Sequence, residues 1–446
     1  MTSATADAWA ALGGQHELVG KVSYQGARGV LPARLPVREL ARATVGVCSL
    51  AAAELLALRN SAPVPSVRVH EGAVATAFVS ERHLQIDGRT PTSFAPLSGF
   101  WRAADGWVRT HANYPHHRSR LLSALGIPDT GDDNALKKLL SDKMASHDAQ
   151  WLQETVYAAG GLTVAVGSTP SEVTHPLVET RLLGEGDAEA LPPSSLPANG
   201  VRVLDLTRVI AGPVATRTLA LLGADVLRVD SPQLPESEDA HADTGMGKRS
   251  TVLDLADSVV VEALLSSADV VVTGYRPGAL DRFGLSPEAL RERHPDLVVA
   301  QLDAWGRSGP LAGRRGFDSL VQAATGIAMT EATADGHPGV LPAQALDHGT
   351  GYLLAAAVLR ALTERHSSGG GRHVRLSLAG TASWLQRGIR PEPLDGEDYE
   401  PQPWLTRTAS PYGELRHALP PVRYDGAPRT WARPPSRWGT DRPAWR

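Results

Sequence analysis

The stretch VRVLDLTRVIAGPVATRTLALLGADVLRVD, residues 201–230, decides the fold class. Its two ends are short apolar runs typical of buried strands, and between them a helix is expected over 213–222, ending at Gly223. More strands are expected in TVLDL, DVVVTGY and DLVVAQLD, with a helix that begins at Ser286 and Pro287 before the last of them. Because strands alternate with helices, we predict an α/β protein with a Rossmann-like parallel sheet in a large domain.

A second informative stretch is PAQALDHGTGYLLAAAVLRALTERHSSGGGRHVRLSLAG, residues 342–380. This stretch predicts a long apolar helix that begins at Gly349 and Thr350 and ends at the glycines from 369 onward. Asp347 stands just before this helix, near its positive dipole end, so we expect a lowered pKa and an ionised carboxylate. Both an ordinary N-cap aspartate and a covalent nucleophile fit this position.

Five blocks of residues 201 to 347 resemble, in order and spacing, the family III CoA-transferases. They lie in the stretch quoted first, in GKRSTVLDL, and in ADVVVTGYRPGALDRFGLSPEALRERHPDLVVAQLDAWGRSGPLAGRRGFDSLVQAATG. That family includes formyl-CoA and carnitine CoA-transferases and α-methylacyl-CoA racemase. The resemblance implies that Asp347, in ALDHGTG, is the nucleophile, and that the partners are an acyl-CoA and a carboxylic acid. It implies no permanently bound cofactor, with coenzyme A (CoA) or acyl-CoA as substrate.

The resemblance also suggests where CoA binds. CoA is a polyanion, so arginine and lysine are expected along its groove. The matching blocks give these CoA-contacting candidates: Arg208, Ala211, Lys248, Arg249, Tyr275, Arg276, Arg282 and Arg315. For any one of the basic residues, a solvated surface charge is the alternative. Gly274 and Tyr275 replace the usual Asn-Phe of the family, so one contact to CoA is expected to be lost.

Three functions stay open at this point. The racemase branch has Gly-His-Asp where this chain has Gly316, Phe317 and Asp318. Racemisation requires a base on each face of the carbon, so the missing histidine favours a CoA-transferase over a racemase or isomerase. A non-catalytic CoA-binding subunit is the third possibility. His348 fits a general base or, preferably, polar packing, and Gly349 is a candidate for bringing oxyanion-binding N–H groups close to the substrate.

The chain divides into three regions by texture. Residues 1–195 are expected to be a permuted, degenerate segment of the family, and its motif at 100–180 a smaller α+β domain. Residues 196–390 are expected to be the Rossmann-like CoA-binding and catalytic domain, and 391–446 an extended C-terminal tail. In the family the small-domain segments follow the catalytic half, whereas here they precede it. Family members form interlocked dimers, so we predict a homodimer or a compact pseudo-dimer.

A faint internal repeat accompanies the permutation. LAAAELLAL at 50–58 matches LAAAVLRAL at 354–362 in seven of nine positions, which places Ala43 where the second copy has Asp347. The first copy is therefore expected to be inert if the repeat is real; chance similarity of alanine-leucine helices is the alternative. Nearby, helices are expected around 38–59 and 133–160, with strand-like character in VRVHEGAVATAFV and GWVRTHANY.

The composition and charge of the chain argue against several classes of binding partner. The 446 residues carry a net charge of −4 without any basic run, which argues against nucleic acid and anionic membranes. No window holds 18 consecutive apolar residues, so no membrane insertion is expected. The single cysteine, Cys48, lies in an apolar stretch and predicts a buried thiol in a cytoplasmic protein. The histidines lack partners at ligand spacing, so no metal is expected.

Overall fold

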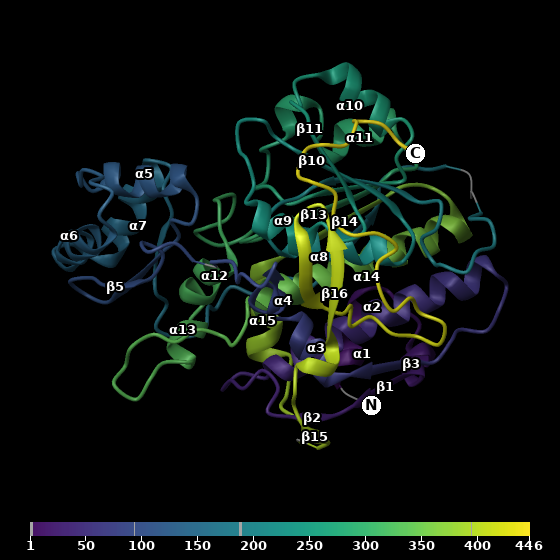
Figure 1. Cartoon of the computed structure of the whole chain (residues 1–446), viewed down its shortest axis with the longest axis horizontal. Coiled ribbons are helices and arrows are strands. Elements are labelled where there is room, and N and C mark those ends of the chain that lie inside the picture. Colours follow the sequence, from purple (N-terminus) through teal and green to yellow (C-terminus); the bar gives the residue numbers. More distant parts are fainter. Residues whose placement is uncertain (1–2, 93, 187–189, 394) are drawn as a thin grey trace.

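A seven-stranded sheet forms the centre of the computed structural model, which describes residues 3–92, 94–186, 190–393 and 395–446 (Figure 1). The strands are ordered β11-β10-β9-β12-β13-β14-β8, and β8 is antiparallel to its neighbour whereas the other pairs are parallel. Their bounds are β8 (Glu179–Leu182), β9 (Arg202–Leu206), β10 (Asp225–Asp230), β11 (Arg249–Val252), β12 (Val270–Thr273), β13 (Val298–Asp303) and β14 (Arg372–Ser377). This is the Rossmann strand order with one strand added, and it confirms the predicted fold class.

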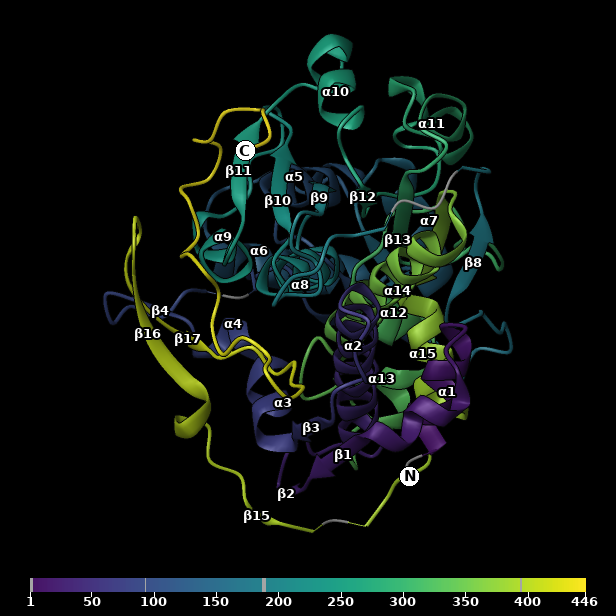
Figure 2. The same ribbon diagram turned by 90° about the vertical axis from the view of Figure 1, so that its right-hand side faces the viewer.

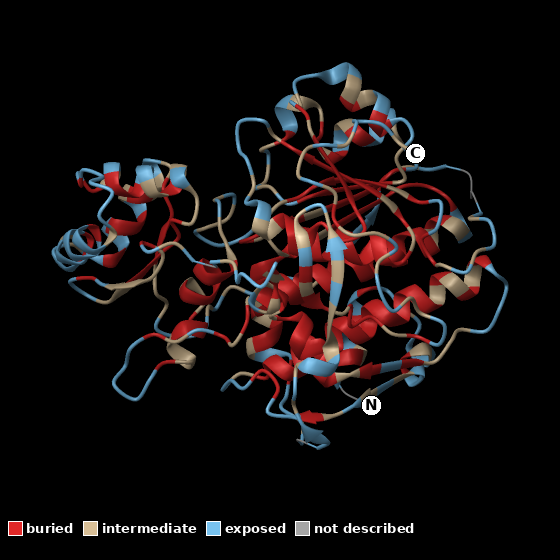
Figure 3. Ribbon diagram, in the orientation of Figure 1, coloured by how far each residue is buried: buried red, intermediate tan, exposed pale blue. Residues whose placement is uncertain are grey.

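Alternate residues of the buried strands enter different cores. Val270 and Val272 of β12 pack with helices on one face, whereas Val271 packs with helices on the other. The first face is covered by α8 (Ala211–Leu221) and α14 (Ala345–Ser368), and the second by α10 (Ser258–Leu265) and α11 (Pro287–Arg293) (Figure 2). Strands buried on both sides explain the continuous apolar runs in the sequence (Figure 3).

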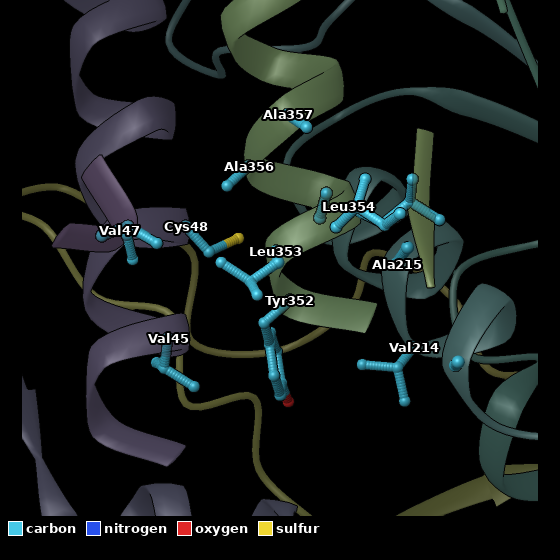
Figure 4. Close-up of a cluster of buried hydrophobic side chains, with 14 of the residues drawn as sticks. Val45, Val47, Cys48, Val214, Ala215, Tyr352, Leu353, Leu354, Ala356 and Ala357 are labelled. Atoms are coloured by element: carbon cyan, nitrogen blue, oxygen red, sulfur yellow. The ribbon is translucent and has the colours of Figure 1, made fainter. Parts of the chain in front are cut away.

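Helix α14 packs along α2 (Val37–Arg59), so the two copies of the alanine-leucine motif face each other. Figure 4 shows Cys48 of α2 directed toward Leu353 and Ala356 of α14. By length and composition α2 is apolar enough to cross a membrane, with a mean hydropathy of 1.5, but 89% of that window is buried inside the protein. It is therefore a core helix, and Cys48 is fully buried as expected.

The two copies also continue alike. After α2 come β3 (Val67–His70) and α3 (Glu71–Ala77), and after α14 come β14 and α15 (Leu378–Arg387). In addition, β1 (Val22–Gln25) pairs in parallel with β3, as β13 does with β14. This shared order supports the repeat. The strand-like reading of VRVHEGAVATAFV was wrong beyond its first four residues, because Nδ1 of His70 accepts a hydrogen bond from Gly72 N at 3.0 Å and caps a helix.

A smaller unit stands apart at the left of Figure 1. Its antiparallel sheet contains β5 (Phe100–Arg102), β6 (Trp107–Thr110) and β7 (Thr163–Ala165). Its helices are α5 (Pro115–Ala124), α6 (Asp133–Ala145) and α7 (Ala149–Ala158), so the helix expected over 133–160 is interrupted. These elements share a hydrophobic core of their own. They contact the large sheet's domain through stacking of the His111 and Phe317 rings, whose centroids are 3.7 Å apart.

The C-terminal region is docked along its length. A hairpin of β16 (Leu405–Ser410) and β17 (Gly413–Ala418), which the sequence did not indicate, pairs with β4 (Gln85–Ile86). Beyond it, the indoles of Trp431, Trp438 and Trp445 donate hydrogen bonds to large-domain residues at 2.8 to 3.0 Å. The other elements are α1 (Ser3–Ala11), β2 (Ala27–Arg28), α4 (Ser80–His83), α9 (Glu238–Thr244), α12 (Asp318–Ala324), α13 (Ile327–Thr330), β15 (Glu397–Asp398) and the 3-10 helices His16–Lys21, Asp281–Phe283 and Gln402–Trp404.

Candidate active site

Asp347 lies in the first turn of α14, which begins at Ala345 rather than after the aspartate. Helix α14 leads into β14, so its first turn lies at the carboxyl edge of the parallel sheet, where ligands of such folds bind. The residue is 7% exposed. Within the described parts of the chain, neither of its carboxylate oxygens takes part in a hydrogen bond or ion pair. A buried carboxylate without partners is typical of a functional group and not of an N-cap.

The carboxyl group of Asp318 adjoins Asp347. Its Oδ2 accepts a hydrogen bond from the backbone N–H of Asp347 at 2.9 Å, and its Oδ1 accepts one from Nε2 of Gln322. Gln322 is fixed in turn, because its Oε1 accepts the N–H of Leu341 at 2.9 Å. Asp318 is only 1% exposed, and burial raises its pKa to about 6. From the sequence, Asp318 was noted only because the residue before it is not the histidine of the racemase branch; no role was predicted for Asp318 itself.

The prediction of a lowered pKa for Asp347 was wrong. Burial raises its pKa well above the ordinary value, and the negative charges of Asp318 and Glu81 raise it further. Desolvation outweighs the helix dipole, which is equivalent to only about half a charge. In addition, the backbone N–H of Asp347, at the start of the helix, donates to Oδ2 of Asp318. This N–H is therefore not available to stabilise the charge of the Asp347 side chain. The Asp347 carboxyl group therefore keeps its proton to a higher pH than an ordinary aspartate does.

Glu81 of α4 brings the N-terminal region into this site. Its Oε2 is 3.4 Å from Nε2 of His348, whose ring stacks on Phe78 with centroids 5.3 Å apart. His348 is 1% exposed, and neither ring nitrogen has a hydrogen-bond partner among the residues that the structure describes. No hydrogen bond connects the described His348 side chain with Asp347. The sequence gave no signal for Glu81, because it is 266 positions away from Asp347 in the chain.

The expected oxyanion role of Gly349 gains no support. His348 N already donates to Gln344 O at 3.0 Å, and Gly349 follows it as the fifth residue of α14, where N–H groups bond within the helix. A Cβ at Gly349 would meet Thr381 and Leu40 at ordinary contact distance, so this glycine does not face an open space.

Three CoA candidates, Arg208, Tyr275 and Arg276, follow the neighbouring strands β9 and β12, at which the strand order of the sheet reverses. Tyr275 and Arg276, which follow β12, line a cavity of about 250 Å³ together with residues from the ends of β12 and β13. Arg208, which follows β9, lies over the Tyr114 ring at 5.3 Å and forms a 3.5 Å ion pair with Glu236. Val209 has a φ of 71°, an unusual conformation for a β-branched residue. Strain of this kind is concentrated at binding sites.

The other candidates are dispersed. Lys248 is completely buried and its Nζ lies 3.0 Å from Oδ2 of Asp205, while burial lowers its pKa to about 8. Arg249 forms a 2.8 Å ion pair with Asp225. Ala211 is the buried first residue of α8. Arg282 and Arg315 are exposed. Lys248, Arg249 and Arg282 therefore do not line the cavity that contains Tyr275 and Arg276.

Comparison with known proteins finds relatives for about half of the chain. Residues 199–418 match the model of CoA-transferase family III. The probable fatty acyl-CoA transferase Rv3272 of Mycobacterium tuberculosis is 36% identical over 206 residues, which cover 43% of this chain and 52% of the relative. Formyl-CoA:oxalate CoA-transferase of Afipia carboxidovorans is 36% identical over 195 residues, covering 40% and 46%. A crystal structure of Rv3272 superposes with a TM-score of 0.41, covering 43% of this chain and 56% of that one.

Residues 199–418 thus constitute a family III CoA-transferase domain, as the resemblance predicted. The chain spans about half the length of the curated relatives it matches.

Proposed function

We propose that the protein transfers CoA from an acyl-CoA to a carboxylic acid, with Asp347 as the nucleophile. The observation that carries the proposal is the unpaired, buried carboxylate of Asp347 at the carboxyl edge of a family III sheet. The names of the relatives, a fatty acyl-CoA transferase and a formyl-CoA:oxalate CoA-transferase, agree with this class of reaction.

The reaction would proceed through covalent intermediates on Asp347. Its carboxylate attacks the thioester carbonyl, forms an aspartyl-acyl anhydride and releases the CoA thiolate. The thiolate attacks the aspartyl carbonyl, gives an aspartyl-CoA thioester and releases the donor acid. The acceptor carboxylate then displaces CoA as a thiolate, forming a second anhydride. Attack of the thiolate on the acceptor's carbonyl gives the new acyl-CoA and restores the Asp347 carboxylate.

Asp318 and Glu81 have a specific effect on this cycle. Their charges and the low exposure of the site make the Asp347 carboxylate less stable than it is in water. Formation of the anhydride or the thioester removes the charge from Asp347, so the repulsion disappears as the reaction proceeds. Destabilisation of the ground state that is relieved in the transition state accelerates the step.

The CoA nucleotide would bind in the cavity at the ends of β12 and β13. Arg276 has no acidic partner among the ion pairs of the described residues, and Tyr275 adds an aromatic surface in the same cavity. Arg315 is close enough to Arg276 for their charges to repel, so a bound polyphosphate would stabilise both.

We also propose that one chain acts as a pseudo-dimer, since the α2–β3–α3 copy packs against the catalytic copy and lacks the aspartate at Ala43. Light scattering at monomer mass would support this, and a homodimer would require the interlocked alternative. The buried, unpaired Cys48 fits a cytoplasmic location.

An isotope experiment tests the proposed reaction. With a carboxylic acid labelled with ¹⁸O in its carboxylate, each transfer through Asp347 should leave one acceptor oxygen in the protein, detectable in the peptide that contains Asp347. In a single turnover, transfer of the acceptor's oxygen to the released donor acid, with none in the peptide that contains Asp347, would contradict the mechanism. Exchange of the α-hydrogen of an acyl-CoA with deuterium, without transfer, would favour the racemase or isomerase alternative.

A further inference from the structure

Arg109 is a buried guanidinium without an anionic partner. It lies on β6 of the smaller unit, is 9% exposed, and within the described residues its side chain makes no hydrogen bond or ion pair. Its Nε is completely buried and lacks an acceptor. Its guanidinium carbon lies over the ring of Phe100, 4.7 Å from the ring centroid. Burial lowers the pKa of Arg109 to about 10, and the charge of Asp318 only partly opposes this shift.

The other buried arginines among the described residues bond to acids or, as Arg59 does, to backbone carbonyl oxygens. Arg228 lies 2.7 Å from Asp230, Arg217 lies 3.0 Å from Asp243, and Arg42 lies 2.7 Å from Glu71. A buried charge without a partner is costly, and proteins usually retain one only where something binds to it. The contrast between Arg109 and these arginines indicates an anion that completes the site.

The strand geometry directs Arg109 toward the catalytic half. Val108 belongs to the core of the smaller unit, so its neighbour Arg109 points from the opposite face of the sheet. That face packs against α12, which begins at Asp318. Asp318 attracts Arg109 electrostatically without coming within ion-pair distance, and it is hydrogen-bonded to the backbone of Asp347. Arg109 is therefore near the reaction centre but separated from it.

We propose that Arg109 binds the far carboxylate of a short dicarboxylic acid whose near carboxylate exchanges CoA with Asp347. The inference rests on the proposed function and adds the substrate class to it. The near carboxylate must reach the carbonyl carbon of Asp347, whereas Arg109 lies beyond Asp318. A second negative group on the substrate bridges this separation and supplies the missing counter-charge.

Succinate and butyrate test the inference, because they have equal chain length and differ in the second carboxylate. The full-length protein should accept CoA onto succinate with a kcat/KM at least tenfold above that for butyrate. Arg109→Gln should lower the value for succinate about 100-fold, the loss expected for a charge-assisted hydrogen bond, and change that for butyrate by less than threefold. Arg102→Gln, on the exposed end of neighbouring β5, is the matched control and should change neither.

Equal losses for both acids in Arg109→Gln would overturn the inference, as would a wild-type preference for butyrate. If Arg109→Gln does not fold, Arg109→Lys keeps the charge and should retain the preference for succinate over butyrate, with a raised KM for succinate. Loss of this preference in Arg109→Lys would contradict the inference. Formation of the CoA adduct from succinyl-CoA or butyryl-CoA, measured without acceptor, separates the two proposals. No adduct refutes the proposed function, whereas an adduct without succinate preference refutes only the role of Arg109.

Discussion

The backbone N–H of Asp347 donates a hydrogen bond to Oδ2 of Asp318 across 2.9 Å, and this places two buried carboxyl groups together at the start of α14. Two such groups cannot ionise independently, so they titrate as a coupled pair. The pKa of Asp347 is therefore influenced by a residue of a different helix.

The first prediction concerns the pH dependence of transfer. The reaction requires the Asp347 carboxylate, so kcat/KM should rise with pH through the raised pKa of the pair. Asp318→Asn removes a negative neighbour and should move this rise about one pH unit lower. Asp142→Asn, on the exposed surface of α6, is the control and should leave the profile unchanged. An unshifted profile in Asp318→Asn would refute the electrostatic coupling.

The second prediction concerns how the free energy of unfolding depends on pH through the Asp318 and Asp347 carboxyl groups. Since Asp318 has a pKa of about 6 in the folded protein, above the ordinary value, the folded state binds more protons than the unfolded state between these values. The free energy of unfolding of the wild type should therefore decrease as pH rises from about 4 to about 6. Urea unfolding at several pH values should show a smaller decrease for Asp318→Asn. An equal decrease in both proteins would assign it to other groups.

Lys248 gives a prediction about the fold. Lys248→Met would leave Asp205 buried without its partner and should reduce the free energy of unfolding by about 3 kcal/mol in urea unfolding. Lys138→Met, at an exposed ion pair on α6, should cost less than about 0.5 kcal/mol. Unchanged stability of Lys248→Met together with a tenfold higher KM for acyl-CoA would restore Lys248 as a CoA contact.

Arg276 tests the CoA cavity. Arg276→Gln should weaken CoA binding about tenfold in calorimetry, because one charge-assisted contact to a phosphate is lost. Arg291→Gln, on an exposed part of α11 outside the cavity lining, is the control. Equal affinities for wild type and Arg276→Gln would exclude the cavity at the ends of β12 and β13 as the CoA site.

The sequence predicted the sheet well because apolar runs and glycine stops are local signals. Gly223 and the glycines from 369 onward end α8 and α14 within one or two residues of the expected positions. The strand reading after His70 failed, because a side-chain cap and an alanine-rich segment favoured a helix.

The site was only partly predictable, for physical reasons. The motif predicts a functional role for Asp347, but the pKa of this residue depends on burial and on Glu81 and Asp318, which no local pattern connects with it. Lys248 belongs to a matching block, yet a tertiary ion pair with Asp205 holds it in the core. Arg109 was overlooked because the lack of a partner is visible only in the folded chain.

The most direct measurement is the mass of the intact protein after incubation with an acyl-CoA, followed by peptide mapping. Wild type should gain the mass of CoA on the peptide containing Asp347, and hydroxylamine should remove it. Asp347→Asn should fold normally, show no adduct and lose transfer by a factor of about 1,000 or more. An adduct on another residue, or transfer at the wild-type rate by Asp347→Asn, would contradict nucleophilic catalysis by Asp347.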